Sequence, residues 1–378
     1  MCDFPITLHA AFSPVWDALN TFFWPAVFEG SISETEKRLF TLPTRMGGMG
    51  IRNPIETANN AYETSRIGTS VIVDAIKGKV PFSMLDHNDQ FAKTISSMHN
   101  IRHQDQATQD SILSILDAKK KRAFRRSIDG KTSAWLAVLP LCTHHFDVSA
   151  TEFRDALAMR YQRPLLRMPA TCDGCGAAFN LEHALDCRKG GLVIQRHNEI
   201  RDALGDLASI AFRNVIKEPV VKEANIRDGT PALIADISIR GLWEPQAVAL
   251  LDVRVVDTDA PSHIHRNTVA VLCSAEEEKK RKYNSAAEAC RASFTPFVVS
   301  TDGMLGREAN FLLKRLAQSI SIKWEKPLGQ TTGWLRAKLS FAILRATNLC
   351  LRGSRIKWRS GVGIDDGAGL PAELPKLD

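Results

Sequence analysis

From residue 190 onward, the pattern of apolar and polar positions predicts a regular succession of helices and strands. Ile200, Leu204, Leu207 and Ala211 fall on one helical stripe, which predicts a helix over roughly 197–213. Alternating or β-branched segments predict strands at 215–221, 232–239, 248–256 and 294–300, with a charged helix at 275–289 before the last strand. The order helix, strand, strand, strand, helix, strand places this region in the mixed α/β (α+β) class.

The flanking regions have helical patterns and predict mainly helical N-terminal and C-terminal parts. Residues 79–118 are polar and weakly periodic, and residues 306–350 combine leucines with Trp324, Trp334 and Phe341. A turn-rich stretch at 42–51 contains Gly47, Gly48 and Gly50, but no Lys-Ser/Thr pair follows it and no buried strand precedes it. A structural turn is therefore preferred over a phosphate-binding loop.

The composition is that of a folded protein and excludes several classes. Hydrophobic residues make up 44% of the 378 positions and charged residues 24%, which excludes a disordered tail and a collagen-like repeat. No apolar run approaches the length of a membrane span, and no basic segment followed by a long apolar stretch opens the chain. We therefore expect a soluble protein that is not secreted and has no membrane partner, located in the nucleus or the cytoplasm.

A net charge of +7 permits a polyanionic partner without requiring one. The positive charge is concentrated at 119–126, 279–282 and 352–359. In the first of these segments six of eight residues are basic, and a nucleic-acid contact is about as good an interpretation as a solvated helix face. The candidate nucleic-acid-binding residues are Lys119, Lys120, Lys121, Arg122, Arg125 and Arg126.

Three of the eight cysteines and one histidine form the pattern Cys-x2-Cys-x7-His-x3-Cys. The predicted ligands are Cys172, Cys175, His183 and Cys187. Zn²⁺ takes four such ligands tetrahedrally, and Gly174 and Gly176 supply the tight turn that a knuckle needs. Four protein ligands leave no open position, so the Zn²⁺ would be structural; the alternative is a coincidental spacing of buried cysteines. His197 is a spare candidate ligand.

Two carboxylates interrupt apolar strands in the mixed region. Asp236 lies in the second predicted strand and Asp252 in the third, where Arg254 projects to the same side as Asp252. Converging carboxylates bind Mg²⁺, which polarises a phosphodiester and lowers the pKa of a bound water. Arg254 would stabilise the developing charge, and Glu199 on the preceding helix is a candidate third carboxylate. The alternative is that these acids are solvated or protect a sheet edge.

On the following charged helix, Lys279 and Tyr283 are four residues apart and share a face suited to reaching a phosphate. A salt-bridged surface helix explains the same pattern nearly as well. Both residues are therefore candidate site residues.

Together these segments resemble the C-terminal region of non-LTR retrotransposon proteins of the restriction-like-endonuclease class. That family places a Cys-Cys-His-Cys knuckle before a PD-(D/E)xK nuclease core, and the run 196–202 is similar to the opening helix of that core. Asp236 and Asp252 match the two catalytic aspartates of the family, and Lys279 and Tyr283 its downstream lysine and tyrosine. The stretch 42–51 resembles the segment after the polymerase thumb.

The resemblance implies five regions. They are a helical remnant of the post-polymerase region (1–118), a basic helical linker (119–165), the zinc knuckle (166–190), the restriction-like endonuclease domain (191–305) and a helical C-terminal region with a basic tail (306–378). The aromatic-x-Asp-Asp pattern of a polymerase is absent from the sequence, so reverse transcription is not expected from this chain.

The resulting expectation is a Mg²⁺-dependent endonuclease that nicks a DNA strand, with DNA and the RNA of the element as partners. A second hypothesis is a decayed nuclease that still binds nucleic acid; it is favoured by Ala235 before Asp236, where the family has proline, and by Arg254, where many such nucleases have lysine. A third is an interaction fragment with no nucleic-acid role.

Overall fold

The computed structural model describes residues 8–225 and 229–356 of the chain. Its longer helices are α1 (Leu8–Ala18), α2 (Trp24–Phe28), α3 (Glu34–Thr41), α4 (Pro54–Ile76), α5 (Met84–Ile115), α6 (Ala118–Asp129), α7 (Ala150–Tyr161), α8 (Leu181–Asp186), α9 (Leu192–Ala211), α10 (Thr268–Ala289), α11 (Arg307–Trp324) and α12 (Leu328–Arg352). Its strands are β1 (Val215–Lys217), β2 (Val220–Lys222), β3 (Leu233–Ile234), β4 (Ile237–Arg240), β5 (Val248–Val256) and β6 (Ala292–Ser300). The mixed α/β class is confirmed.

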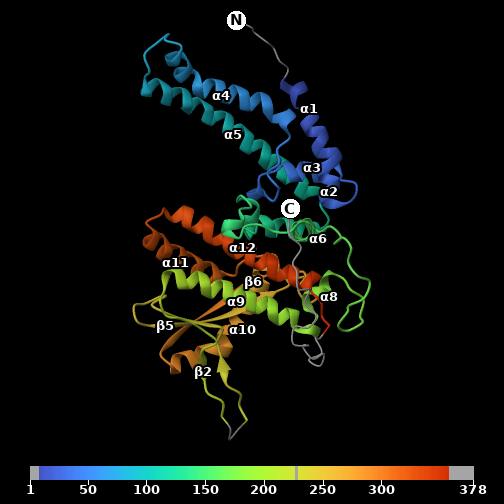
Figure 1. Ribbon diagram of the computed structural model, residues 1–378, viewed down its shortest axis with the longest axis vertical. Coiled ribbons are helices and arrows are strands. Elements are labelled where there is room, and N and C mark those ends of the chain that lie inside the picture. The colour runs from blue at the N-terminus through green and yellow to red at the C-terminus, as the bar shows by residue number, and fades with distance from the viewer. Residues whose placement is uncertain (1–7, 226–228, 357–378) are drawn as a thin grey trace, which may run out of the picture.

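A small mixed sheet with the strand order β1-β4-β5-β6 forms the centre of the lower body in Figure 1. β1, β4 and β5 pair antiparallel, whereas β5 and β6 pair in parallel and are connected through α10. β2 and β3 form a separate two-stranded ribbon. The sheet is therefore an antiparallel meander extended by one crossover strand.

Helices cover both faces of this sheet. Leucine, isoleucine and alanine side chains of α9, α11 and α12 share one large core with β4, β5 and β6. On the opposite face, α10 packs Tyr283 and Ala287 against Leu250, and Val271 and Leu272 against Val298. Because successive residues of β5 point to opposite faces, the apolar Leu251 and Val253 enter the first core while Asp252 faces α10.

Two predicted strands are each broken in the structure. The predicted strand 215–221 divides into β1 and β2 because Glu218 has a positive φ of 54° and Pro219 has no N–H to donate. The predicted strand 232–239 divides into β3 and β4 at Ala235 and Asp236, where the chain passes from the ribbon to the main sheet. The predicted strand 248–256 is confirmed as β5 without change.

A second core joins α2, α3 and α7 through Trp24, Phe40 and Tyr161, and α2 and α3 lie below α4 in the upper half of Figure 1. The long helices α4 and α5 extend away from it as a hairpin. The turn at 42–51 closes this core: Gly47 has a φ of 93°, and a Cβ placed there would lie 2.1 Å from a ring carbon of Phe124. A Cβ on Gly48 would lie 2.0 Å from the Leu42 carbonyl oxygen, so the glycines allow close packing, as expected of a structural turn.

The cores cross two of the expected region boundaries. Phe124 of α6 and Leu157 of α7 belong to the N-terminal core, so both helices of the segment 119–165 pack against the preceding region. Leu316 of α11 and Leu339 of α12 belong to the core of the sheet, so residues 306–352 complete the mixed region instead of following it as a separate unit. Within the described residues, no helix is both long enough and apolar enough to cross a membrane.

Candidate metal centre and carboxylate groove

The four predicted zinc ligands lie together. The donor atoms of Cys172, Cys175, His183 and Cys187 all lie within 4.8 Å of one another. The Sγ atoms of Cys172 and Cys187 are 3.9 Å apart, and Cys175 Sγ lies 3.3 Å from His183 Nε2. Sulfur atoms bound tetrahedrally at about 2.3 Å from Zn²⁺ are separated by about 3.8 Å. The donor set and its spacing therefore fit a tetrahedral Zn²⁺ site with four protein ligands.

Short-range backbone interactions produce this cluster. Gly176 has a φ of 75° and donates to the Cys172 carbonyl, which closes the turn between the first two cysteines. Asn180 accepts a hydrogen bond from the His183 N–H and starts α8, which presents His183. Burial opposes charge on the Cys172 thiol, but the N–H groups of Gly174 and Cys175 outweigh it and lower its pKa to about 6. This favours the thiolate, the form that binds a metal.

The end of α12 holds the cluster against the rest of the protein. Arg355 donates to the carbonyl oxygens of Ala184 and Cys350 and lies 4.9 Å from the ring centroid of Phe179. Asp173, between the first two cysteines, accepts a hydrogen bond from the Arg355 N–H at 2.8 Å. The knuckle is thus connected to the sheet region through α12.

The two predicted metal carboxylates, Asp236 and Asp252, lie at the point where β4 begins to pair with β5. Ile237 pairs with Leu251, and each aspartate is the next residue beyond that pair on its own strand. Asp236 Oδ2 accepts the Val253 N–H at 2.5 Å. Asp236 Oδ1 lies 3.0 Å from His197 Nε2 of α9. The structure therefore places both carboxylates beside the same segment of β5.

Asp252 is 4% exposed and has a cationic partner on α10. Lys279 Nζ lies 2.5 Å from Asp252 Oδ2. Tyr283, one turn further along the helix, donates its hydroxyl to the Ile234 carbonyl at 2.9 Å. Burial, and after it the neighbouring Asp252 carboxylate, raise the pKa of Tyr283, so the hydroxyl keeps its proton. Lys279 and Tyr283 thus belong to one cluster with Asp252.

Beyond Leu251, the edge of β5 facing β4 has no neighbouring strand within the described residues. A groove runs along this edge, and the following residues line it: Val193, Arg196 and His197 of α9, Val253, Arg254 and Val255 of β5, and Glu278, Lys279 and Lys282 of α10. Arg254 Nη1 lies 2.5 Å from Glu278 Oε2, and this contact lowers the pKa of Glu278. The groove is therefore an open, mainly basic channel next to the two aspartates.

Glu199 does not join the aspartates. It is exposed on α9, and among the side chains that the structure describes the cysteine–histidine cluster is the only group of three or more potential metal ligands. His197, considered as a spare zinc ligand, instead contacts Asp236. Sequence reasoning missed this role, although His197 is two residues from Glu199 in the same predicted helix.

The basic segment at 119–126 divides into two faces. Arg126 is 6% exposed and pairs with Asp259 and Asp302, while Arg122 donates to Asp259 and to the Thr258 carbonyl. These two arginines join α6 to the loops after β5 and β6, and carboxylates of the protein already compensate their charges. Lys119 and Arg125 are exposed, and Lys120 and Lys121 are half-buried.

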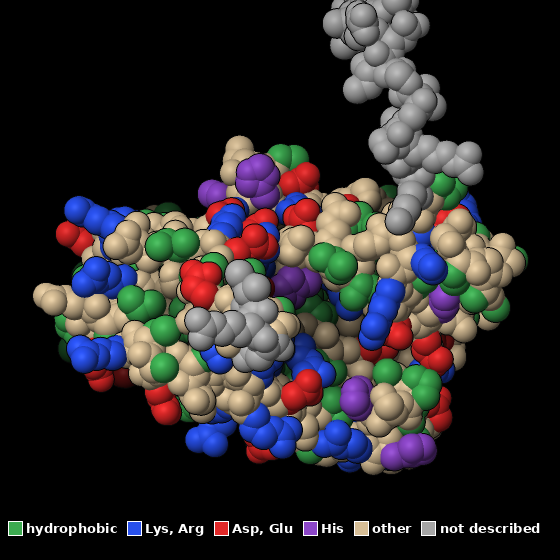
Figure 2. All heavy atoms as spheres, turned by 90° about the horizontal axis from the view of Figure 1, so that it is seen from below, with side chains coloured by type: hydrophobic (Ala, Val, Ile, Leu, Met, Phe, Trp, Pro, Cys, Tyr) green, Lys and Arg blue, Asp and Glu red, His purple; other side chains and the backbone are tan. Residues whose placement is uncertain are grey.

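The described basic residues at 352–355 are likewise paired or buried, and so they offer little charge on the surface. Arg352 pairs with Asp155, and Arg355 is 3% exposed beneath the knuckle, while Lys357 and Arg359 lie outside the described residues. Figure 2 shows Lys and Arg side chains interspersed with Asp and Glu on the face that it presents. The basic side chains on this face are therefore interrupted by acidic ones.

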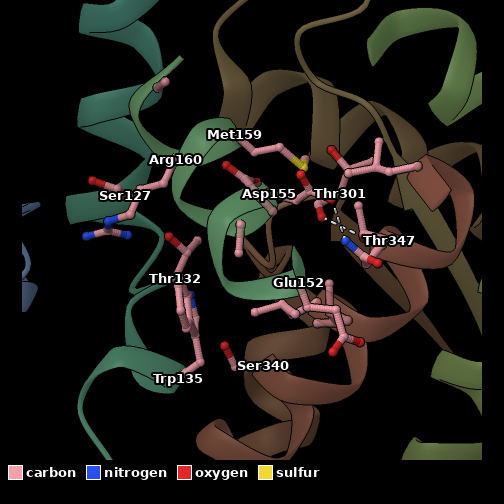
Figure 3. Close-up of a pocket in the computed structure, with 17 residues that line it drawn as sticks. Ser127, Thr132, Trp135, Glu152, Asp155, Met159, Arg160, Thr301, Ser340 and Thr347 are labelled. Carbon is pink, nitrogen blue, oxygen red and sulfur yellow. Dashed lines mark hydrogen bonds between the residues drawn. The ribbon is translucent and has the colours of Figure 1, made fainter. Parts of the chain in front are cut away.

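A different pocket lies between α6, α7 and α12, with Ser127, Thr132 and Met159 among its lining side chains (Figure 3). Its buried carboxylate, Asp155, accepts hydrogen bonds from Asn348 Nδ2 at 2.9 Å and from Arg352. None of the predicted site residues lines this pocket. The two other carboxylates that line it also have protein partners: Glu152 accepts the Ser149 N–H, and Asp302 pairs with Arg126.

Comparison of the chain with models of known protein families finds no match. Comparison with curated protein sequences finds none either.

Proposed function

We propose that this chain is a Mg²⁺-dependent endonuclease that nicks DNA, built on a PD-(D/E)xK core and derived from a non-LTR retrotransposon protein. The observation that supports it best is the grouping of Asp236, Asp252 and Lys279 at the open edge of β5. The order of elements also supports it. If β1 with β2 and β3 with β4 are each counted as one strand, the order is helix, strand, strand, strand, helix, strand, as expected from the sequence.

The division of roles follows from these positions. Asp236 and Asp252 would hold Mg²⁺, which supplies Lewis-acid polarisation of a phosphodiester and activation of a water. Lys279 compensates the Asp252 charge and stays next to the reacting phosphate. Arg254, paired with Glu278 on the groove wall, would orient the nucleic-acid backbone. Tyr283 retains its proton and positions the Ile234 carbonyl and the nearby Asp252.

The cysteine–histidine cluster would hold structural Zn²⁺ in this proposal. Its four donors leave no coordination position on the metal for a substrate, and the cluster contacts the sheet region through α12. DNA, and the RNA of the element, are the proposed partners, and the nucleus is the proposed location.

The proposal is tested by incubating the purified chain with supercoiled plasmid and Mg²⁺. We expect nicking by the wild-type protein and its loss in Asp236→Ala, with DNA binding in a gel shift unchanged. Asp206→Ala, which removes an exposed acid of α9 whose ion pair is with Lys217 of β1, is the matched control and should nick normally. Equal nicking by Asp236→Ala and the control would refute the site.

A second function, nucleic-acid binding by a decayed nuclease, is favoured by one observation. Each aspartate already has protein partners, and Glu199 supplies no third carboxylate. This alternative predicts a salt-sensitive gel shift with no cleavage in Mg²⁺ or Mn²⁺.

A further inference from the structure

Arg196 occupies a position that α9 otherwise fills with apolar side chains. It lies between Leu192 and Ile200 on the helical stripe that enters the core, and it is 5% exposed. Its Nε and Nη1 groups are buried and have no hydrogen-bond partner. A buried guanidinium without a counter-charge is costly, so an arginine at this position points to a ligand that supplies one.

Among the side chains that the structure describes, no carboxylate forms an ion pair with Arg196. The Cys350 thiol of α12 is beside it, and burial raises the pKa of that thiol, which keeps it neutral. The groove that Arg196 lines holds three other charged contacts, and each is internally paired: Arg254 with Glu278, Lys279 with Asp252, and His197 with Asp236.

Lys282 is the second cation of the groove without an acidic partner. It is exposed on α10, and its contacts are with its neighbour Tyr283, at 3.4 Å from the hydroxyl and 4.8 Å from the ring centroid. Among the ion pairs of residues 8–225 and 229–356, none includes Arg196 or Lys282. After internal pairing, the groove therefore has an excess of two positive charges, one on each wall.

We propose that Arg196 and Lys282 form an oxyanion site that binds a phosphate group in the groove, beside the aspartate pair. Phosphate oxygens accept charge-assisted hydrogen bonds from a guanidinium and an ammonium, and they remove the uncompensated charge. The site extends the proposed function and rests on it for one point only: the ligand there is a phosphate of the DNA backbone next to the one that is cleaved.

The site is tested without added Mg²⁺, so that binding is measured separately from cleavage. Thermal unfolding of the zinc-loaded chain is followed in inorganic phosphate and in chloride at equal ionic strength, and binding of a fluorescent ten-nucleotide single strand is measured by anisotropy. Wild-type protein should unfold at higher temperature in phosphate than in chloride, because a ligand that binds only the folded state stabilises it.

The two variants differ in their expected effect on the unfolding temperature of the ligand-free protein. Arg196→Met removes a buried charge from an apolar stripe, so its unfolding temperature in chloride should rise, while its response to phosphate is lost. Lys282→Met should leave the unfolding temperature in chloride unchanged and also lose the response. Each variant should bind the oligonucleotide about tenfold more weakly. Arg281→Met, which removes the neighbouring exposed cation, is the matched control and should behave as wild type.

A stronger response to the oligonucleotide than to inorganic phosphate, at equal phosphate concentration, assigns the site to the nucleic-acid backbone. A stronger response to inorganic phosphate assigns the oxyanion site to free phosphate and overturns the backbone assignment. If Arg196→Met responds to both ligands as wild type does, or if wild type responds to neither, the site is refuted. Failure of the nuclease proposal is seen separately, as absence of plasmid nicking by wild-type protein in Mg²⁺.

Discussion

The cysteine–histidine cluster and the carboxylate groove differ in how their charges are compensated. The cluster brings three thiol groups and an imidazole within 4.8 Å, with no lysine or arginine among its donors. In the groove, Asp252 has Lys279, and Asp236 has His197 and the Val253 N–H. The first arrangement offers donors that a bound cation would stabilise as thiolates, whereas the charges of the second are already compensated by groups of the protein.

This difference has a consequence for folding and for function. A cluster that depends on an ion couples metal binding to the stability of the whole connection between α8 and α12. A groove whose acids are already paired folds independently of metal, and a metal or substrate must displace those partners when it binds. Removal of Zn²⁺ should therefore affect the structure around the cluster, whereas removal of Mg²⁺ should affect the activity of the groove.

The largest effect is expected from Cys172→Ser, which removes a buried ligand of the cluster. The free energy of unfolding should fall by more than about 4 kcal/mol, because structural zinc contributes directly to folding. Zinc content measured by mass spectrometry should fall from one ion per chain to less than half, together with the midpoint of denaturant unfolding. Cys142→Ser changes an exposed cysteine outside the cluster and is the control. Equal stability of the two variants would mean that the cluster does not need a metal.

A smaller effect is expected from breaking the ion pair in the groove. Asp252→Asn leaves Lys279 without its partner in a mostly buried position and should cost about 3 kcal/mol, and Lys279→Met should cost a similar amount by leaving Asp252 unpaired. The double variant should recover most of that loss, because no uncompensated charge remains. Denaturant titrations of the four proteins measure the coupling.

Plasmid nicking by the same proteins separates stability from chemistry. Every variant with Asp252→Asn should be inactive, including the stable double variant. If the double variant is destabilised by the sum of the two single changes, the pair is not coupled. If it nicks plasmid at the wild-type rate, Asp252 has no role in cleavage.

The same contrast explains what could be predicted from the sequence. The zinc ligands are separated by at most seven residues, so their spacing alone predicted the cluster. Asp236 and Asp252 could be paired because they interrupt successive apolar strands. Lys279 was a candidate site residue, but its pairing with Asp252 and the contact of His197 with Asp236 could not be predicted. The two residues come from helices on opposite faces of the sheet, and only the packing of those helices determines which side chains reach the acids.

The intramolecular partners of the basic segment of α6 could not be predicted for the same reason. Arg122 and Arg126 are four residues apart and share a helical face, which the sequence shows as a face suited to an anion. The anion is Asp259 of the chain itself, more than 130 positions away, together with Asp302. Local charge density predicts that a counter-charge is needed, but it does not distinguish a carboxylate of the protein from a phosphate of a ligand.

The smallest effect is expected from His197→Ala, which tests whether the Asp236 partner can be exchanged for a metal. Loss of the 3.0 Å contact should lower the free energy of unfolding by about 1 kcal/mol, since Asp236 keeps its bond from the Val253 N–H. His265→Ala, at an exposed position, is the control and should have no effect. In saturating Mg²⁺ the cost of His197→Ala should become smaller, because a cation bound by Asp236 replaces the stabilisation that the imidazole supplied. A cost that is the same with and without Mg²⁺ would show that the carboxylate keeps its protein partners and binds no ion.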